Sequence, residues 1–174
     1  MKLKLLLLTF IAVATGAANA QPVEMMLTDR LDGNLDSYCL DISGSKKRAD
    51  ISKGLQTHTC YSYQGAMGVD QTFDSARLAE EQLYMPEFDV CVTVSELKSG
   101  ASVGLSTCDN TDQQAISMTS NGQLSPVNAP ELCFTAGSET RLGRGGTSKH
   151  QIKSLSLQLC SEDLAKYQHW ELRG

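Results

Sequence analysis

The sequence lacks the motifs on which several common enzyme classes depend. It contains no His-Glu-x-x-His pair and no glycine-rich phosphate loop. Its three histidines, His58, His150 and His169, are not spaced like metal ligands. The adjacent acids Glu80 and Glu81 are more typical of a solvated surface than of a pair of hydrolytic carboxylates. We therefore expect a protein that is not an enzyme, with no cofactor and no metal.

Positive charge is also scarce. The chain has 15 Lys and Arg against 20 Asp and Glu, which gives a formal net charge of −5 at pH 7. Basic residues gather only at Lys46-Lys47-Arg48 and between positions 141 and 149. Nucleic-acid binding needs clustered cations that displace phosphate counterions, so we expect no nucleic-acid partner. We interpret both short basic clusters as solvated loops.

Long apolar runs are missing after residue 20. A membrane-spanning helix needs about 20 consecutive apolar residues, and no later segment approaches that length, so we expect no membrane span. The start of the chain has the parts of a secretory signal peptide: two early lysines, an apolar stretch over residues 5–13 and the small-x-small site Ala18-Asn19-Ala20. We expect residues 1–20 to be removed by cleavage near Ala20 and the product to be secreted or periplasmic.

The remaining residues, 21–174, are interpreted as one domain. Aromatic residues are few, and no heptad pattern, low-complexity tract or proline-rich linker divides this part of the chain. Its length suits a single hydrophobic core. Short apolar or alternating segments bounded by turn-forming residues predict strands over 38–42, 90–94, 132–135 and 155–159. Only residues 75–83 have a helix-like composition, so the sequence predicts a strand-rich domain.

Six cysteines follow one another as three pairs, Cys39 with Cys60, Cys91 with Cys108 and Cys133 with Cys160. An even cysteine count in an exported protein favours disulfides. Six cysteines allow fifteen connectivities, and adjacent pairing is the simplest of them because it repeats with the sequence. Each closed loop of about 20 residues would stabilise the fold by roughly 3 kcal/mol.

A glutamine follows each cysteine pair, two positions before a large apolar residue. The three triplets are Gln71-Thr72-Phe73, Gln114-Ala115-Ile116 and Gln168-His169-Trp170. Together with the cysteines they recur at a period of roughly 40 to 50 residues, which indicates one small unit used three times. We expect Phe73, Ile116 and Trp170 to enter a shared core, and the glutamine amides to satisfy buried turn groups.

These repeats resemble those of the ricin B-type lectins, in which each repeat opens with a Cys-Leu-Asp-like sequence and closes with Gln-x-Trp. The openings here are Cys39-Leu40-Asp41, Cys91-Val92-Thr93 and Cys133-Phe134-Thr135, and only the third close keeps the tryptophan. The resemblance spans nearly all of residues 21–174. It implies an all-β fold, a β-trefoil of three pseudo-symmetric repeats at about 21–77, 78–126 and 127–174, each stapled by one disulfide.

The resemblance also implies a sugar site in the first repeat. The family's site uses an aspartate two residues after the first cysteine, polar and aromatic residues just before the second, and an Asx-Gln pair at the close. The matching positions are Asp41, Gln56, His58, Asp70 and Gln71. Carboxylates and amides suit sugar hydroxyls, and a ring suits the apolar face of a pyranose. The implied function is that of a secreted lectin, with glycans of galactose type as the first expectation.

Two positions of this site depart from the family's pattern. His58 stands where tryptophan or tyrosine is more usual, and Asp70 stands where asparagine is usual. Tyr61 and Tyr63 lie close by and are alternative sources of the ring. The other two repeats lack both the aspartate and the ring, and we expect no binding there. Their residues at the aspartate, polar and ring positions are Thr93, Gly104 and Ser106 in the second repeat, and Thr135, Ser156 and Gln158 in the third.

Two other functions stay open, because β-trefoils serve several purposes and fold alone does not choose among them. One is protease inhibition through residues 139–150, which lengthen the third repeat and offer Arg141 or Arg144 to a trypsin-like pocket. The Gly145-Gly146 pair argues against the rigidity that an inhibitory loop needs. The other is a recognition subunit of a secreted toxin complex, bound to another exported protein.

Overall fold

The computed structural model describes residues 20–174. The proposed leader, apart from Ala20, lies outside the described residues. The strands of the first repeat are β1 (Pro22–Leu27), β2 (Tyr38–Ile42), β3 (Leu55–Thr59) and β4 (Phe73–Asp74). Those of the second are β5 (Tyr84–Met85), β6 (Val90–Val94), β7 (Val103–Ser106) and β8 (Ile116–Met118). The third has β9 (Leu124–Pro126), β10 (Leu132–Ala136), β11 (Arg141–Leu142), β12 (Gln151–Lys153), β13 (Leu155–Leu159) and β14 (Trp170–Arg173).

The helical segments are all short. The α-helical turns are α1 (Ser75–Leu78), α2 (Gly143–Gly146) and α3 (Ala165–Gln168). The 3₁₀ turns are η1 (Lys46–Arg48), η2 (Ile51–Lys53), η3 (Tyr61–Gln64), η4 (Val69–Gln71) and η5 (Glu162–Leu164). The helix expected over 75–83 is reduced to α1, which Asp74 caps by accepting a hydrogen bond from the Ala76 N–H. Within residues 20–174, no helix is long and apolar enough to cross a membrane.

Three antiparallel hairpins share one register, and this gives the fold its threefold pattern. They are β2–β3, β6–β7 and β10–β13. In each, the first cysteine pairs with the residue two positions before the second cysteine: Cys39 with His58, Cys91 with Ser106 and Cys133 with Gln158. Equivalent positions of the three repeats can therefore be compared residue by residue.

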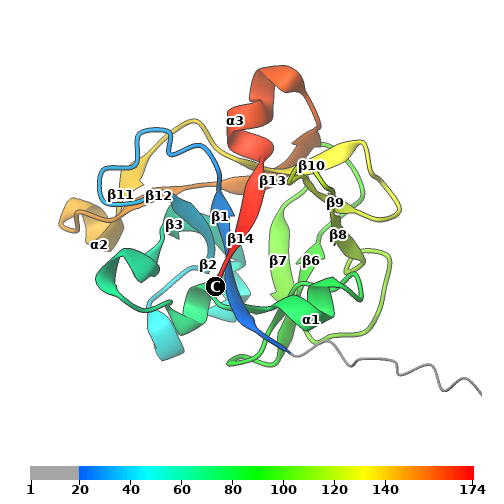
Figure 1. Cartoon of the computed structure of the whole chain (residues 1–174), viewed down its shortest axis with the longest axis horizontal. Coiled ribbons are helices and arrows are strands. Elements are labelled where there is room, and N and C mark those ends of the chain that lie inside the picture. The colour runs from blue at the N-terminus through cyan, green and yellow to red at the C-terminus, as the bar shows by residue number, and fades with distance from the viewer. Residues whose placement is uncertain (1–19) are drawn as a thin grey trace, which may run out of the picture.

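The outer strands join the repeats to one another. β14 at the end of the chain pairs with β1 at its start, and these two strands run side by side in Figure 1. β8 pairs with β9 to join the second and third repeats, and β4 pairs with β1 within the first. Asn121 and Gly122 turn the chain between β8 and β9. Gly122 has a φ of 87°, and a Cβ there would lie 2.4 Å from the Trp170 carbonyl oxygen, so this position requires glycine.

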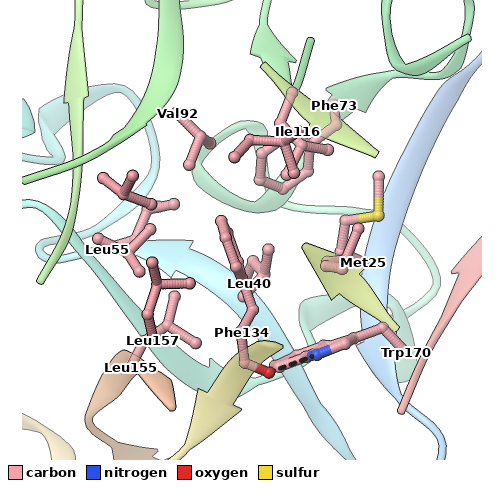
Figure 2. Packing of buried hydrophobic residues seen from close by; sticks show 14 of the residues in the cluster. Met25, Leu40, Leu55, Phe73, Val92, Ile116, Phe134, Leu155, Leu157 and Trp170 are labelled. Carbon is pink, nitrogen blue, oxygen red and sulfur yellow. Dashed lines mark hydrogen bonds between the residues drawn. The ribbon is translucent and has the colours of Figure 1, made fainter. Parts of the chain in front are cut away.

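The core repeats in three as well (Figure 2). Phe73, Ile116 and Trp170, which follow the three glutamines, are fully buried at its centre. Leu40, Val92 and Phe134, each directly after the first cysteine of a repeat, are also buried beside them. The Trp170 indole N–H donates a hydrogen bond of 3.0 Å to the Phe134 carbonyl oxygen, so its polar group is satisfied inside the core. Burying each such side chain contributes about 1.5–3 kcal/mol.

Each repeat is closed by its own disulfide. Cys39 bonds to Cys60, Cys91 to Cys108 and Cys133 to Cys160, with a Cα–Cα distance of 5.0 Å in all three. The adjacent pairing is confirmed, because no bridge crosses between repeats. Together with the three hairpins in one register and the strand pairs that join the repeats, this confirms the predicted all-β β-trefoil.

Candidate functional site

The three repeated glutamines brace the three hairpins in the same way. The side-chain oxygen of each accepts a hydrogen bond from the backbone N–H that follows the second cysteine: Tyr61, Asp109 and Ser161. Its amide nitrogen donates to the carbonyl that precedes that cysteine: Thr59, Thr107 and Leu159. All three glutamines are buried, at 0%, 1% and 0% exposure for Gln71, Gln114 and Gln168. This brace is structural and common to the repeats.

The first repeat adds a buried carboxylate to the brace. The amide nitrogens of Gln71 and Gln56 donate to the two oxygens of Asp41, at 3.1 and 2.8 Å. Burial raises the pKa of the Asp41 carboxyl well above its usual value, the two amides oppose that rise, and the charge of Asp70 adds to it. Asp41 therefore lies beneath Gln56 and accepts a hydrogen bond from its side-chain amide. Almost none of the Asp41 surface is exposed to solvent.

His58 lies at the centre of a small group of rings. Its centroid is 5.0 Å from that of Tyr61 and 5.1 Å from that of His150, the latter in an edge-on arrangement. Nδ1 of His58 lies 2.8 Å from the carbonyl oxygen of Thr59, the geometry of an Nδ1–H donor. Burial lowers the pKa of His58 to about 4. The ring is therefore neutral at pH 7 and acts as a packed aromatic with a polar edge.

Asp70 lies under the turn that follows β2. One of its carboxylate oxygens accepts a hydrogen bond from the Lys46 N–H. The other, Oδ1, is buried without a protein partner. Burial raises the pKa of the Asp70 carboxyl, and the Lys46 N–H opposes this. Gly68 lies close to both Tyr61 and Asp70. A Cβ at this position would lie 2.5 Å from the Tyr61 ring and 2.7 Å from Asp70 Oδ1.

A cavity of about 600 Å³ lies above these residues. One wall comes from the first repeat and includes Gln56 and His58 on β3, Tyr61 and Gln64 of η3, and the turn over 43–46. The other wall comes from the third repeat, over 141–152. Of the five residues expected to bind sugar, Gln56 and His58 line this cavity, whereas Asp41, Asp70 and Gln71 lie beneath it. The exposures are 1% for Asp41, 8% for Gln56, 6% for His58, and 0% for Asp70 and Gln71.

The second wall is a hairpin built by the lengthened part of the third repeat. The basic cluster between positions 141 and 149 was expected to be a solvated loop, but β11 and β12 pair with each other and β12 continues onto β3. Ile152 pairs with His58 and Lys153 with Thr57. The insertion, β11–α2–β12, extends away from the trefoil beside β3 in Figure 1. A segment of the third repeat thus completes the site of the first.

A buried lysine holds this insertion in place. The Lys153 ammonium, 2% exposed, lies 2.9 Å from Asp32 Oδ1 and donates to the Thr140 hydroxyl at 2.6 Å. Partial burial tends to raise the pKa of Asp32, but hydrogen bonds from Thr140, Lys153 and Tyr38 outweigh it and lower that pKa to about 2. The Asp32 carboxylate is therefore charged across the physiological pH range.

Arg141 connects the insertion to the predicted sugar residues. Its Nη2 donates a 2.7 Å hydrogen bond to Oε1 of Gln56. Sequence reasoning named Tyr61 as an alternative source of the ring, but it did not place Arg141 or His150 together with Gln56. The available signal was the longer spacing of the third cysteine pair, 27 residues against 21 and 17, but spacing says nothing about where an insertion packs.

The third repeat has a smaller cavity of about 460 Å³ at the equivalent place. Thr135, Ser156 and Gln158 line it, as their register predicts. No ring was expected there, yet Tyr167 of α3 also lines it. The expectation of a site without an aromatic was wrong, because the ring comes from the residue before the closing glutamine rather than from β13. The aspartate remains absent.

The second repeat contains the spacing of a nucleophile elbow at Gly100-Ala101-Ser102-Val103-Gly104. In the structure this segment leads from a turn into β7, with Gly104 paired to Thr93 of β6. A nucleophile elbow requires a sharp strand-to-helix turn that exposes the serine. The segment is therefore part of a hairpin and does not form an elbow.

Solved structures share this fold at low sequence identity. The mdaA-1 domain matches with a TM-score of 0.62 at 12% identity, over 93% of this chain and 97% of that one. An agglutinin from Abrus precatorius matches with a TM-score of 0.59 at 14% identity, over 92% of this chain, which spans 50% of that one. The Haemophilus ducreyi cytolethal distending toxin matches with a TM-score of 0.54 at 15% identity, over 94% and 88%.

Among curated proteins, a sequence comparison finds no match. However, the sequence model of the family described as "Ricin-type beta-trefoil lectin domain" matches residues 79–174, which is more than half of the chain. The matched part contains the second and third repeats with the insertion. The first repeat has the same hairpin register and the same glutamine hydrogen bonds, so it is a third copy of the same unit. The recognition made from the repeated motifs is confirmed, and the chain belongs to the ricin-type β-trefoil lectin domain family.

Proposed function

We propose that the chain binds carbohydrate in the cavity between the first-repeat hairpin and the third-repeat insertion. The observation that carries the proposal is the lining of this cavity. The Gln56 amide, two histidine rings and the Tyr61 ring line a volume of about 600 Å³, at the position where the family resemblance implies a sugar site. This volume lies within the range of small-molecule sites.

In this proposal, Gln56 and Tyr61 make the main direct contacts. Gln56 uses one N–H for Asp41 and one lone pair for Arg141, so a second N–H and a second lone pair are left for neighbouring hydroxyls. Tyr61 is half-buried on the cavity wall and offers more ring surface than His58. Tyr63, the other alternative, does not line the cavity, and its hydroxyl hydrogen-bonds to His150.

Asp41, Asp70 and Gln71 then act from below, by fixing Gln56, the turn at Lys46 and the start of η3. This differs from the expected direct contact of Asp41 with sugar hydroxyls, because Asp41 is buried and both its oxygens are engaged. A single site with few contacts would bind a monosaccharide at about millimolar Kd, or roughly 4 kcal/mol. Extended or multivalent glycans would raise this affinity.

A glycan array tests the proposal with the folded protein and two matched variants. Tyr61→Ala removes the ring of the first-repeat cavity, and Tyr167→Ala removes that of the third-repeat cavity. We expect the parent and Tyr167→Ala to bind the same glycans and Tyr61→Ala to lose at least about tenfold in affinity. No binding of any glycan by the parent would exclude the lectin function. Loss in Tyr167→Ala alone would place the site in the third repeat.

We further propose export, with cleavage near Ala20. Expression in a bacterial host with an intact secretion system, followed by mass spectrometry of the N-terminus, tests this directly. A mature chain that starts at Gln21 in the periplasm or medium is expected. An uncleaved chain in the cytoplasm would exclude it.

A second candidate function is a recognition subunit of a secreted toxin complex. A chain of the Haemophilus ducreyi cytolethal distending toxin shares the fold over most of both chains, so the fold is compatible with this function. Inhibition is less well supported, because the Arg141 side chain is engaged with Gln56 and only Arg144 is free at the tip. Purification from the native source distinguishes the candidates: a second, catalytic chain would accompany a subunit, whereas a lectin that acts alone would be retained on sugar resin as a monomer.

A further inference from the structure

The two basic clusters of the sequence meet at the candidate site. Lys46 belongs to the first cluster and lines the cavity from the turn after β2. Arg141 and Arg144 belong to the second and line it from the insertion. No aspartate or glutamate lines this cavity, among the residues that the structure describes. Positive charge is therefore concentrated at one place on a chain that is acidic overall.

These three cations have no carboxylate partners on the surface. The ion pairs found within residues 20–174 involve Lys47, Lys53, Arg77, Lys98, Lys153 and Arg173, and none involves Lys46, Arg141 or Arg144. Asp41 and Asp70 lie beneath the wall and are buried, and burial raises the pKa of each, so they offset the cations only in part. The charge on the wall is free to face a ligand.

The backbone at two of these cations is unusual. Lys46 and Arg144 each have a φ of 50°, in the left-handed region that few side chains adopt. The turn at Arg144 is tied by its carbonyl, which accepts from the Thr147 N–H and hydroxyl. Lys46 is tied by its N–H, which donates to Asp70. The backbone of each cation is thus held in place, on opposite walls of one cavity.

We propose that the glycan bound in this cavity is acidic, carrying a carboxylate or a sulfate ester that Lys46 and Arg144 hold from the two walls. This rests on the proposed carbohydrate binding and deepens it by naming the class of glycan. Arg144 presents a planar fork that matches either oxyanion, and Lys46 presents a point charge. Arg141 keeps Gln56 oriented for the hydroxyls of the same sugar.

Asparagine is the replacement that tests these two cations without disturbing the turns. It removes the charge and tolerates a positive φ better than other non-glycine residues. The double variant Lys46→Asn/Arg144→Asn is compared with a matched control, Arg48→Asn/Lys149→Asn. The control removes one exposed cation from each of the same two segments, and neither residue lines the cavity. Circular dichroism and thermal melting establish that all three proteins are folded alike.

The probes are neutral glycans on an array, each beside its sialylated and its sulfated derivative, followed by titration of the best pair in solution. We expect the acidic member of a pair to bind about tenfold tighter than the neutral one in the parent and in the control. The advantage should disappear in the double variant and shrink in about 0.5 M salt, since exposed charges are screened.

The outcomes separate this inference from the proposal beneath it. Equal binding of neutral and acidic glycans overturns the inference and leaves carbohydrate binding intact, as does an acidic preference that survives in the double variant. Binding of no glycan of either kind overturns both. If the sialylated derivative alone is preferred, the group held is a carboxylate, and if the sulfated one alone is preferred, it is a sulfate ester.

Discussion

The Arg141 guanidinium donates a 2.7 Å hydrogen bond to the side-chain oxygen of Gln56, across 85 positions of the chain. Gln56 also donates to Asp41, so its amide is fixed from both sides. A residue of the third repeat thereby orients the first-repeat amide that we propose to contact the sugar. The insertion is part of the site rather than an addition to an unrelated surface.

Arg141→Ala is expected to weaken glycan binding more than it weakens folding. Arg141 is exposed, so its removal should change the free energy of unfolding by less than about 1 kcal/mol. Gln56 would lose its partner, and we expect a loss of roughly fivefold in affinity. Isothermal titration with the best glycan measures this, and Lys149→Ala is the control on the same segment. Unchanged affinity in Arg141→Ala would show that Gln56 needs no support from the insertion.

The repeated glutamines offer a matched set of substitutions. Gln71→Ala, Gln114→Ala and Gln168→Ala each remove two hydrogen bonds to backbone groups that are buried or part-buried, at a cost of about 1–3 kcal/mol in stability. Only Gln71 also holds Asp41, so only Gln71→Ala should lose glycan binding. Urea denaturation and titration measure the two effects. Equal binding by all three variants would contradict a role for the first-repeat brace in the site.

His58 should make stability depend on pH. Its pKa is about 4 in the folded protein, because burial disfavours the charged ring, and about 6.5 when unfolded. The unfolded chain therefore binds more protons between these values, so stability falls as pH decreases from 6.5 to 4, by about 3 kcal/mol in all. The raised pKa values of Asp41 and Asp70 act in the opposite direction, since protonation relieves their burial.

A comparison with His58→Gln isolates the histidine from those carboxyls. Glutamine is the residue that the third repeat carries at the same register position. Denaturation at several pH values should show a steeper loss of stability in the parent than in His58→Gln between pH 6.5 and 4. Parallel curves for the two proteins would mean that His58 is not held neutral by burial.

Gly68→Ala tests whether the packing around Tyr61 matters for binding. The new methyl would lie 2.5 Å from the Tyr61 ring and 2.7 Å from Asp70 Oδ1, so the ring must move. We expect a loss of about 1–3 kcal/mol in stability and a clear loss of glycan affinity. Gly104→Ala is the control in the second repeat, where a Cβ meets nothing closer than 3.9 Å. Retained affinity in folded Gly68→Ala would exclude Tyr61 as a contact.

The second-repeat disulfide should contribute stability without contributing to the candidate site. Cys91→Ser/Cys108→Ser opens a loop of 17 residues and is expected to cost about 3 kcal/mol. The first-repeat hairpin keeps its own bridge, Cys39–Cys60, so glycan binding should survive below the lowered melting temperature. Denaturant unfolding and titration measure the two quantities. Loss of binding by the folded variant would mean that the second repeat supports the site.

Much of the fold was predictable because its signals are local and repeated. The segments 38–42, 90–94 and 155–159 coincide with β2, β6 and β13, since alternation and flanking turn residues determine short strands. The three cystines and glutamines added a period that no single motif carries. The pairing of β12 with β3 was not predictable, because it joins segments nearly 100 residues apart and residues 141–146 have the composition of a flexible loop.

The residues of the candidate site were also predictable only in part, because several of its contacts join segments that are far apart in the sequence. The family resemblance implied a site that contains Gln56 and His58, and in the structure both residues line the cavity. The burial of Asp41 depends on how Gln56, Gln71 and the insertion close over it, and these contacts involve distant segments. The basic clusters were interpreted separately as loops, and only the fold brings them to one cavity.

The insertion leaves the trefoil at the tip of the β10–β13 hairpin, where Ala136 pairs with Leu155 and the Gly137 N–H donates to the Ser154 carbonyl. Its base is held by this ladder, which the Cys133–Cys160 bridge closes, and by the pairing of β12 with β3. The part open to exchange is therefore the turn over residues 143–150, between β11 and β12. Segments of other length and sequence grafted there would lie beside the first repeat, which makes this trefoil a scaffold for engineering new recognition.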